Sequence, residues 1–227
     1  WMEEAVSGSI SIFPIQLPEI MTHQTDTPEP AFSIACERNK EPILNILKKE
    51  LADVTEVWEI GSGTGQHAVF FAEALPHLTW QPCDLKINHH DIQTRITIAK
   101  LPNLQPPLEL DVNHFPWPLN SVQAIFSANT LHIVSQTAVQ DFFKGIGKSL
   151  QRGGKLCVYG PFNYQGHYTS ESNARFDRQL KQNSPASGIR DFEWIDHLAR
   201  ESGCSLHCDH EMPANNRLLV WKKEGSS

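Results

Sequence analysis

The sequence lacks any apolar run long enough to cross a membrane, since no uninterrupted hydrophobic stretch approaches the roughly 20 residues of a spanning helix. It also lacks the basic and then apolar N-terminal pattern of a secretory signal. Basic residues are in the minority: 19 Lys and Arg stand against 26 Asp and Glu, for a formal charge of -7. This balance disfavours a broad nucleic-acid-binding surface. These absences predict a cytoplasmic protein, without a membrane partner, whose target is a small molecule or another protein.

Cysteine is scarce, and its spacing suggests no pairing. The five cysteines are an odd number without a C-x-x-C pair, so neither a disulfide framework nor a zinc ribbon is indicated. A cluster with the composition of a metal site consists of Cys204, His207, Cys208 and His210. If this segment is a strand, alternation places Cys204, Leu206 and Cys208 on one face, opposite a polar face. We therefore expect buried thiols and no metal site.

The chain divides into a short lead-in and one domain. Residues 1–30 contain four prolines and no sustained hydrophobic period, so they are expected to be an irregular lead-in or extension. Whether residues 1–20 precede a natural start at Met21 stays open. Residues 31–227 suffice for one sizeable core but are too few for two. After Ser33, Pro42 suits a first helical turn and is followed by apolar residues at helical spacing.

Short apolar runs then alternate with longer amphipathic segments, which is the pattern of β-α units around a parallel sheet. Strands are expected at 56–60, 79–83, 108–111, 124–128 and 155–159, and helices at 66–74, 87–99, 138–149 and 192–202. Two last apolar runs, 204–210 and 217–221, lie too close for a crossover helix and must be antiparallel if they pair. The sequence thus predicts an α/β, Rossmann-like doubly wound sheet of seven strands, mostly parallel with the last strand antiparallel.

One glycine-rich turn carries the main indication of ligand binding. Segment 57–67 runs from a strand through three alternate glycines into a helix, so its backbone can approach a ligand beside free N–H groups. A dinucleotide site would prefer G-x-G-x-x-G, whereas here the third glycine comes one residue early. Glu59, just before the turn, suits a ligand that bears an ammonium and a sulfonium better than a pyrophosphate. This pattern favours S-adenosylmethionine.

The same turn resembles the first motif, E-x-G-x-G-x-G, of the class I S-adenosylmethionine-dependent methyltransferases. The matching residues, which the resemblance assigns to cofactor binding, are Glu59, Gly61, Gly63 and Gly65. The resemblance extends from about residue 33 to residue 222. It implies a methyltransferase domain over residues 31–227.

The ends of the second and third strands extend this resemblance to the nucleoside. Asp84 occupies the position that binds the ribose hydroxyls, for which a carboxylate offers two acceptor oxygens. As an exposed strand-end carboxylate it is expected to add little to stability. Asp111 corresponds to the acid that accepts from the adenine amino group, with Val112 and Leu85 against the ring. The alternative for Asp111 is a carboxylate that caps a turn.

The fourth strand ends in polar residues at the carboxyl edge, where open α/β sheets bind ligands. The resemblance implies that Asn129 orients the methionine part of the cofactor and the acceptor. His132 is a candidate catalytic or acceptor-orienting residue, the alternative being an ordinary hydrogen-bonded histidine. Glu171 is a second candidate base.

Three polar segments, at 36–42, 160–173 and 212–216, look like those of methyltransferase-like proteins catalogued as domain of unknown function 938. They flank the sheet edge and suggest a substrate lid. Arg38 is a candidate clamp for the ligand carboxylate. The candidate substrate-binding residues are Asn163, Tyr164 and Asn173, and for Arg38 and both asparagines the alternative is loop capping.

The interpretation is methyl transfer from S-adenosylmethionine to a small-molecule or protein acceptor by in-line displacement. Positioning supplies most of the acceleration, and a base is needed only if the acceptor must lose a proton. Two alternatives remain open: a nicotinamide-dependent oxidoreductase, and a non-catalytic S-adenosylmethionine-binding interaction protein. The acceptor and the oligomeric state are left open.

Overall fold

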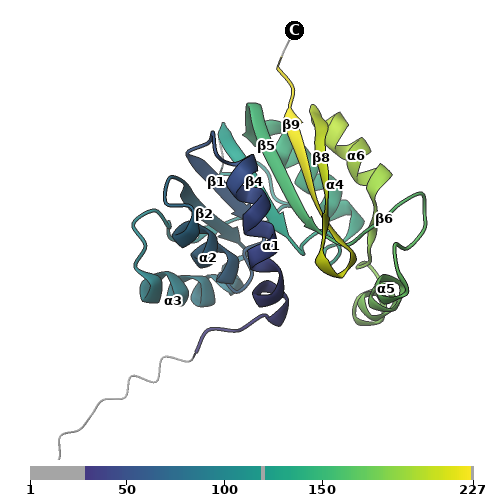
Figure 1. The fold of residues 1–227 in the computed structure, drawn as a ribbon, viewed down its shortest axis with the longest axis horizontal. Helices are drawn as coiled ribbons and strands as arrows, with labels where there is room; N and C mark the ends of the chain where they lie inside the picture. Colours follow the sequence, from purple (N-terminus) through teal and green to yellow (C-terminus); the bar gives the residue numbers. More distant parts are fainter. Residues whose placement is uncertain (1–28, 119–120, 226–227) are drawn as a thin grey trace, which may run out of the picture.

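Seven strands form one central sheet in the order β3-β2-β1-β4-β5-β9-β8 (Figure 1), in a computed structural model that describes residues 29–118 and 121–225. The strands are β1 (Glu56–Ile60), β2 (Thr79–Asp84), β3 (Leu108–Glu109), β4 (Val122–Ala128), β5 (Leu150–Gly160), β8 (Cys204–Met212) and β9 (Asn216–Lys223). Within this sheet β9 runs antiparallel to both of its neighbours, and the other neighbouring pairs are parallel. This confirms the predicted seven-stranded mixed sheet. The expected lead-in at 1–30, including Met21, lies outside the described residues except for residues 29 and 30.

Helices cover both faces of the sheet (Figure 1). The helices α1 (Ile34–Glu50), α2 (Gln66–Ala74) and α3 (His89–Ala99) lie on one face, and α4 (Gln136–Ser149) and α6 (Phe192–Glu201) lie on the other. Consecutive strand residues such as Ile125 and Phe126 are therefore buried in opposite cores. None of the helices in the described ranges is long and apolar enough to cross a bilayer.

Helix α1 begins earlier than its proline indicates. Ser33 caps it by accepting a hydrogen bond from the Cys36 amide at 3.3 Å, so Pro42 lies inside the helix. The expectation of Pro42 in a first turn is wrong. The proline cannot donate to the carbonyl of Arg38, and the helix continues because Ile43 and the apolar residues after it are buried against the sheet.

Strand β8 contains a β-bulge that reverses its alternation. Leu206 and Cys208 pair with successive residues of β9, so His207 is an extra residue in the ladder. Before the bulge, Cys204 and Leu206 pack on the side of α4 and α6, whereas Cys208 packs on the side of α1 and α2. The expectation that Cys204, Leu206 and Cys208 share a face is therefore wrong, because one inserted residue moves every later side chain to the other face.

Further elements, which the apolar pattern did not predict, lie at the carboxyl end of the sheet. They are α5 (Glu171–Asn183) and a two-stranded sheet of β6 (Phe162–Asn163) and β7 (Arg190–Asp191). Among the residues of α5, only Asn173 and Asp177 are buried, so the helix has no apolar stripe to detect. The helix lies beside the β8–β9 hairpin (Figure 1). The side-chain amide of Asn173 donates a hydrogen bond of 3.1 Å to the carbonyl oxygen of Asn215 in this hairpin.

Candidate functional site

The three glycines after β1 all have positive φ, but they face different surroundings. A Cβ on Gly61 would clash with the Thr130 hydroxyl, and one on Gly65 would lie 3.1 Å from the Ile92 Cα. A Cβ on Gly63 would have nothing within 4 Å. Gly61 and Gly65 thus allow close packing within the fold, whereas Gly63 presents its backbone to open space.

Asp84 fixes the shape of this glycine loop. Its Oδ2 accepts from the Gly63 amide at 2.5 Å, and its Oδ1 accepts from the Leu85 amide at 2.7 Å and from the Asn88 side chain at 2.8 Å. Only 8% of the residue is exposed. The expectation of an exposed carboxylate is wrong, because the loop folds back onto the end of β2 and places two backbone N–H groups on it.

A cavity of 480 Å³ opens over Gly63 and Asp84. Helix α1 and the loops after β1, β2 and β4 supply most of its wall, and α5 adds one aromatic residue. The lining includes Cys36, Gly61, Gly63, His67, Asp84, Asn88, Asn129, Thr130, His132 and Phe176. The structure thus brings together five predicted site residues from three separate strand ends: two glycines, Asp84, Asn129 and His132.

Glu59 lies beneath the loop rather than in the cavity. It is 1% exposed, and its Oε2 accepts from the Trp80 indole at 2.8 Å. Burial raises its pKa from 4.5 to about 8, against the hydrogen bond from Trp80, which lowers it, and the neighbouring Asp84 raises it further. At neutral pH the Glu59 carboxyl is therefore mostly protonated and acts as a buried support of the loop.

Glu59→Gln is expected to remove a pH dependence of stability. Because the folded-state pKa lies above the unfolded value, this carboxyl stabilises the fold below about pH 4.5 and loses that contribution as the pH rises to about 8. The unfolding free energy of the wild type should fall relative to Glu59→Gln by about 1 kcal/mol per pH unit across this window. Urea unfolding at pH 5, 6, 7 and 8 measures it.

The control for this prediction is Glu56→Gln. Glu56 also accepts from an indole, that of Trp58 at 2.9 Å, but its replacement leaves Glu59 in place, so the slope should persist. Parallel pH profiles for the wild type and Glu59→Gln would contradict the prediction.

The loop after β4 positions two predicted residues. Asn129 has a positive φ of 57°, held by a hydrogen bond from its amide to the Tyr159 carbonyl oxygen at 2.9 Å. Such a conformation is costly for a residue with a side chain and is found preferentially at functional sites. The His132 ring packs edge-on against Phe176, with ring centroids 5.4 Å apart. Burial lowers the pKa of His132 to about 4, so its imidazole is neutral at pH 7.

A second cavity, of 620 Å³, adjoins the first and shares Ala35, Asn129 and Phe176 with it. Its wall is rich in amides and contains one arginine. The lining consists of Ala35, Arg38, Asn39, Pro42, Asn129, Tyr159, Pro161, Ser172, Asn173, Phe176, Pro213, Ala214 and Asn216. The structure therefore places Arg38 and Asn173 in this second cavity, whereas the carboxylate-clamp hypothesis would have Arg38 in the first.

Three other predicted substrate or catalytic residues line neither cavity. The Glu171 side chain is 96% exposed and lies 3.8 Å from Arg175. The Tyr164 hydroxyl donates to Asp209 at 2.7 Å. Asn163 is buried, and its Oδ1 has no hydrogen-bond partner among the described residues. The two candidate bases, Glu171 and His132, therefore do not lie in the same cavity.

The residues expected around adenine lie at the same sheet edge but outside both cavities. Leu85 follows β2 and is exposed, and Val112 packs partly into the core. Asp111 accepts from the Asn113 amide at 2.9 Å and from the Asn113 side chain at 2.8 Å, which lowers its pKa. The Oδ1 of Asp111 is thus engaged in capping a turn, and its Oδ2 lies 2.9 Å from Nδ1 of His114.

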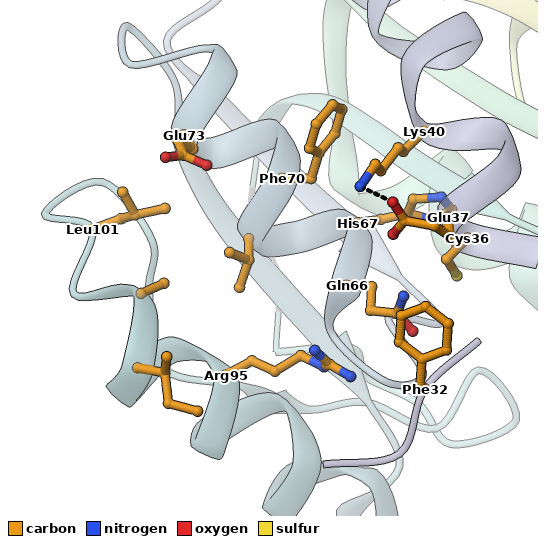
Figure 2. Close-up of a pocket in the computed structure, with 13 residues that line it drawn as sticks. Phe32, Cys36, Glu37, Lys40, Gln66, His67, Phe70, Glu73, Arg95 and Leu101 are labelled. Atoms are coloured by element: carbon orange, nitrogen blue, oxygen red, sulfur yellow. Dashed lines mark hydrogen bonds and ion pairs between the residues drawn. The ribbon is translucent and has the colours of Figure 1, made fainter. Parts of the chain in front are cut away.

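A third cavity, of 380 Å³, lies between α1, α2 and α3 (Figure 2). In its wall Lys40 pairs with Glu37 (Figure 2), and Arg95 donates to the carbonyl oxygens of Thr64 and Ala31 at 2.8 and 2.6 Å. It contains neither the glycine loop nor Asp84. We therefore assign the functional site to the first two cavities.

Sequence reasoning missed several residues of the site. His67 is buried in α2, with its Nε2 2.6 Å from Oδ1 of Asn39, and burial lowers its pKa to about 4. Phe176 belongs to α5, which had no detectable apolar pattern. A histidine two residues after the last glycine of the motif was an available signal, but its partner on α1 could be identified only in three dimensions.

The sequence model of a family described as "Protein of unknown function (DUF938)" matches residues 30–223. Similar solved structures include an O-methyltransferase family protein from Burkholderia thailandensis, with a TM-score of 0.73, 17% identity, and coverage of 85% of this chain and 58% of that chain. Human N-acetylserotonin methyltransferase in complex with S-adenosylmethionine has a TM-score of 0.70 at 14% identity, covering 84% of this chain and 53% of that chain.

An O-methyltransferase family 2 protein from Planctomyces limnophilus, in complex with apigenin, has a TM-score of 0.72 at 12% identity and covers 83% of this chain and 58% of that chain. The chain thus spans somewhat more than half the length of these structures. At such identities the likeness establishes a shared fold, the Rossmann-like sheet of methyltransferase structures.

Proposed function

Because the chain belongs to the DUF938 family, whose description assigns no function, we propose one from its site: transfer of a methyl group from S-adenosylmethionine to a small polar acceptor. The observation that carries this proposal is the open space over Gly63, beside the Asp84 carboxylate, in a cavity that shares three residues with a second one. Two adjoining sites are what a two-substrate transfer requires.

The residues present fit the cofactor. The backbone of the glycine loop would hold the methionine part, and Asp84 would accept from the ribose hydroxyls. Exposed Leu85 and partly buried Val112 would contact the adenine ring, with Asp111 toward its amino group. Glu59 would support the loop from beneath. We assign these roles to the unit of residues 31–227 and place the protein in the cytoplasm, where its five free cysteines would stay reduced.

The second cavity fits an acceptor of small-molecule size. Its 620 Å³ lies within the range of ligand pockets. Arg38 is the one charged residue among those that line it, and its other polar groups are amides and hydroxyls. Arginine recognises carboxylates and phosphates, so the acceptor is expected to be neutral or anionic. Protein acceptors are the less favoured class.

When bound, S-adenosylmethionine supplies an electrophilic methyl group on a sulfonium. The acceptor's lone pair would form the new bond to the methyl carbon as the carbon–sulfur bond breaks, with that bond's electron pair left on sulfur. Asn129 and Phe176, which line both cavities, would align the two reactants for this displacement. The neutral imidazole of His132 would accept a hydrogen bond from the acceptor, and its proton if the acceptor loses one.

Isothermal titration with S-adenosylmethionine, its demethylated product and NAD tests the proposal against its alternatives. Binding of the first two without NAD supports it, whereas binding of NAD alone favours a nicotinamide-dependent oxidoreductase. Methyl-labelled cofactor, incubated with fractions of a small-molecule extract, then tests transfer. Cofactor binding without transfer to any fraction would favour a non-catalytic binding protein.

Arg38→Gln is expected to distinguish cofactor binding in the first cavity from acceptor binding in the second. Since Arg38 lines only the second one, the dissociation constant for S-adenosylmethionine should change less than about threefold, and labelled transfer to the acceptor fraction should fall at least tenfold. Titration and initial rates are measured on the same preparation. The reverse result, weaker cofactor binding with an unchanged transfer rate at saturation, would indicate that Arg38 binds the carboxylate of the cofactor's methionine part.

A further inference from the structure

Three side chains with metal-ligating atoms meet at the far edge of the sheet, away from both cavities of the site. Glu50 is the last residue of α1, and Cys208 and His210 belong to the edge strand β8. One ligand atom from each lies within 4.8 Å of the other two. None of these residues lines either cavity of the proposed function.

The β-bulge at His207 is what produces this arrangement. Without the extra residue, Cys208 would continue the face of Cys204 and point toward α4 and α6. With it, Cys208 lies on the α1 side, and His210, two residues further along the strand, shares that side. Bulges often redirect side chains at functional sites.

The Glu50 carboxylate is largely shielded from solvent and faces two histidines. Its side chain is 12% exposed, and its ion-pair partners among the described residues are two histidines. The His210 Nε2 lies 3.4 Å from Oε1, and the His207 Nε2 lies 4.0 Å from Oε2. Carboxylates that are largely withdrawn from water are ordinarily paired with a cation or bound to a metal ion.

We propose that Glu50, Cys208 and His210 bind a divalent cation of the zinc type. A thiolate, an imidazole and a carboxylate are all established zinc ligands, and a soft sulfur ligand disfavours magnesium and calcium. Two anionic ligands balance the charge of the ion. Binding displaces the thiol proton of Cys208 to solvent. His207 offers a further nitrogen at the margin of the site for the fourth position.

Ligand atoms around a tetrahedral zinc ion, at about 2.0 to 2.3 Å from it, lie roughly 3.3 to 3.8 Å from one another. The three ligand atoms, which are at most 4.8 Å apart, would therefore reach these distances if the side chains moved by about 1 Å. The ion would tie the end of α1 to β8. Helix α1 carries Arg38 and Asn39, and β8 leads into Pro213, so both elements joined by the ion contribute to the acceptor cavity wall.

Cobalt titration of the untagged, metal-free protein tests the site directly. A Co²⁺ ion bound to a thiolate gives a near-ultraviolet charge-transfer band, so one equivalent per chain should produce that band. Cys208→Ser should abolish it, and Glu50→Gln and His210→Ala should each weaken binding at least tenfold. With Zn²⁺ at about 100 times its dissociation constant, the melting temperature should rise by about 5–10 °C.

The matched control is His197→Ala, because His197 also lies beside a carboxylate, with its Nε2 3.4 Å from Glu201, but has no cysteine in that pair. It should bind Co²⁺ as the wild type does. A band that persists in Cys208→Ser, or affinities in Glu50→Gln and His210→Ala equal to that of His197→Ala, would overturn the proposal and indicate adventitious metal only. Because the assay needs neither cofactor nor acceptor, it succeeds or fails independently of the proposed methyl transfer.

Discussion

Gly63→Leu is expected to weaken S-adenosylmethionine binding at least a hundredfold, which corresponds to about 2.7 kcal/mol. The reason is steric: a side chain on Gly63 extends into the open cavity, where nothing in the fold lies within 4 Å of its Cβ. The leucine can therefore enter the cofactor's volume without a clash in the unliganded protein. Isothermal titration measures the loss.

The control for this prediction is Gly153→Leu. Gly153 also has a positive φ, of 74°, and open space around its Cβ, but it lies in β5 outside the cavities. Both variants should lose roughly 1–2 kcal/mol of stability from backbone strain. Only Gly63→Leu should lose the ligand. Equal affinities in the two folded variants would mean that the cofactor site has been misplaced.

Asp84→Ala is expected to weaken cofactor binding at least a hundredfold and to destabilise the protein as well. Two hydrogen bonds from ribose hydroxyls to a charged acceptor are worth about 1.5–3 kcal/mol each. The same carboxylate accepts from Gly63, Leu85 and Asn88 within the fold, so the free energy of unfolding should also fall by about 1–3 kcal/mol. Titration and urea unfolding measure the two losses separately.

Asp196→Ala separates the ligand effect from the structural one. Asp196 is also 8% exposed and accepts from the Trp221 indole at 3.0 Å and from Arg200 at 2.8 Å, but it lies on α6. It should show a similar loss of stability with unchanged cofactor affinity. If Asp84→Ala shows the same pattern, the carboxylate is a structural support alone. Asp84→Asn, which keeps the shape, extends the test should the alanine variant unfold.

The sequence predicted those parts of the site that depend on short-range patterns. The strand before the glycines, the turn itself and the helix after it occupy adjacent residues, so periodicity and glycine spacing locate them. The methyltransferase resemblance pointed to Asp84, the last residue of β2, and to Asn129, which follows β4, and parallel strands bring their carboxyl ends to one edge. The antiparallel direction of β9 followed from the short connection before it.

The errors arose where a contact between distant segments changed a local preference. Pro42 suits a helix start, but the Ser33 cap begins the helix earlier, and the burial of Ile43 against the sheet sustains it past the proline. Glu59 opens the motif, yet the folded loop covers it and leaves it mostly protonated at neutral pH beneath the cavity. Arg38 is a plausible clamp by type, but the course of α1 places it in the second cavity.

By itself, the sequence determined the succession of strands in the main sheet and of the helices other than α5, the glycine turn and the acid at the end of β2, because each depends on the local alternation of side chains and on chain length. Only the tertiary structure decided which of the three glycines is open to a ligand, whether Asp84 is buried, and that Glu50 meets Cys208 and His210. Each of these depends on contacts between segments far apart in the chain or, in β8, on a single inserted residue that alternation alone does not reveal.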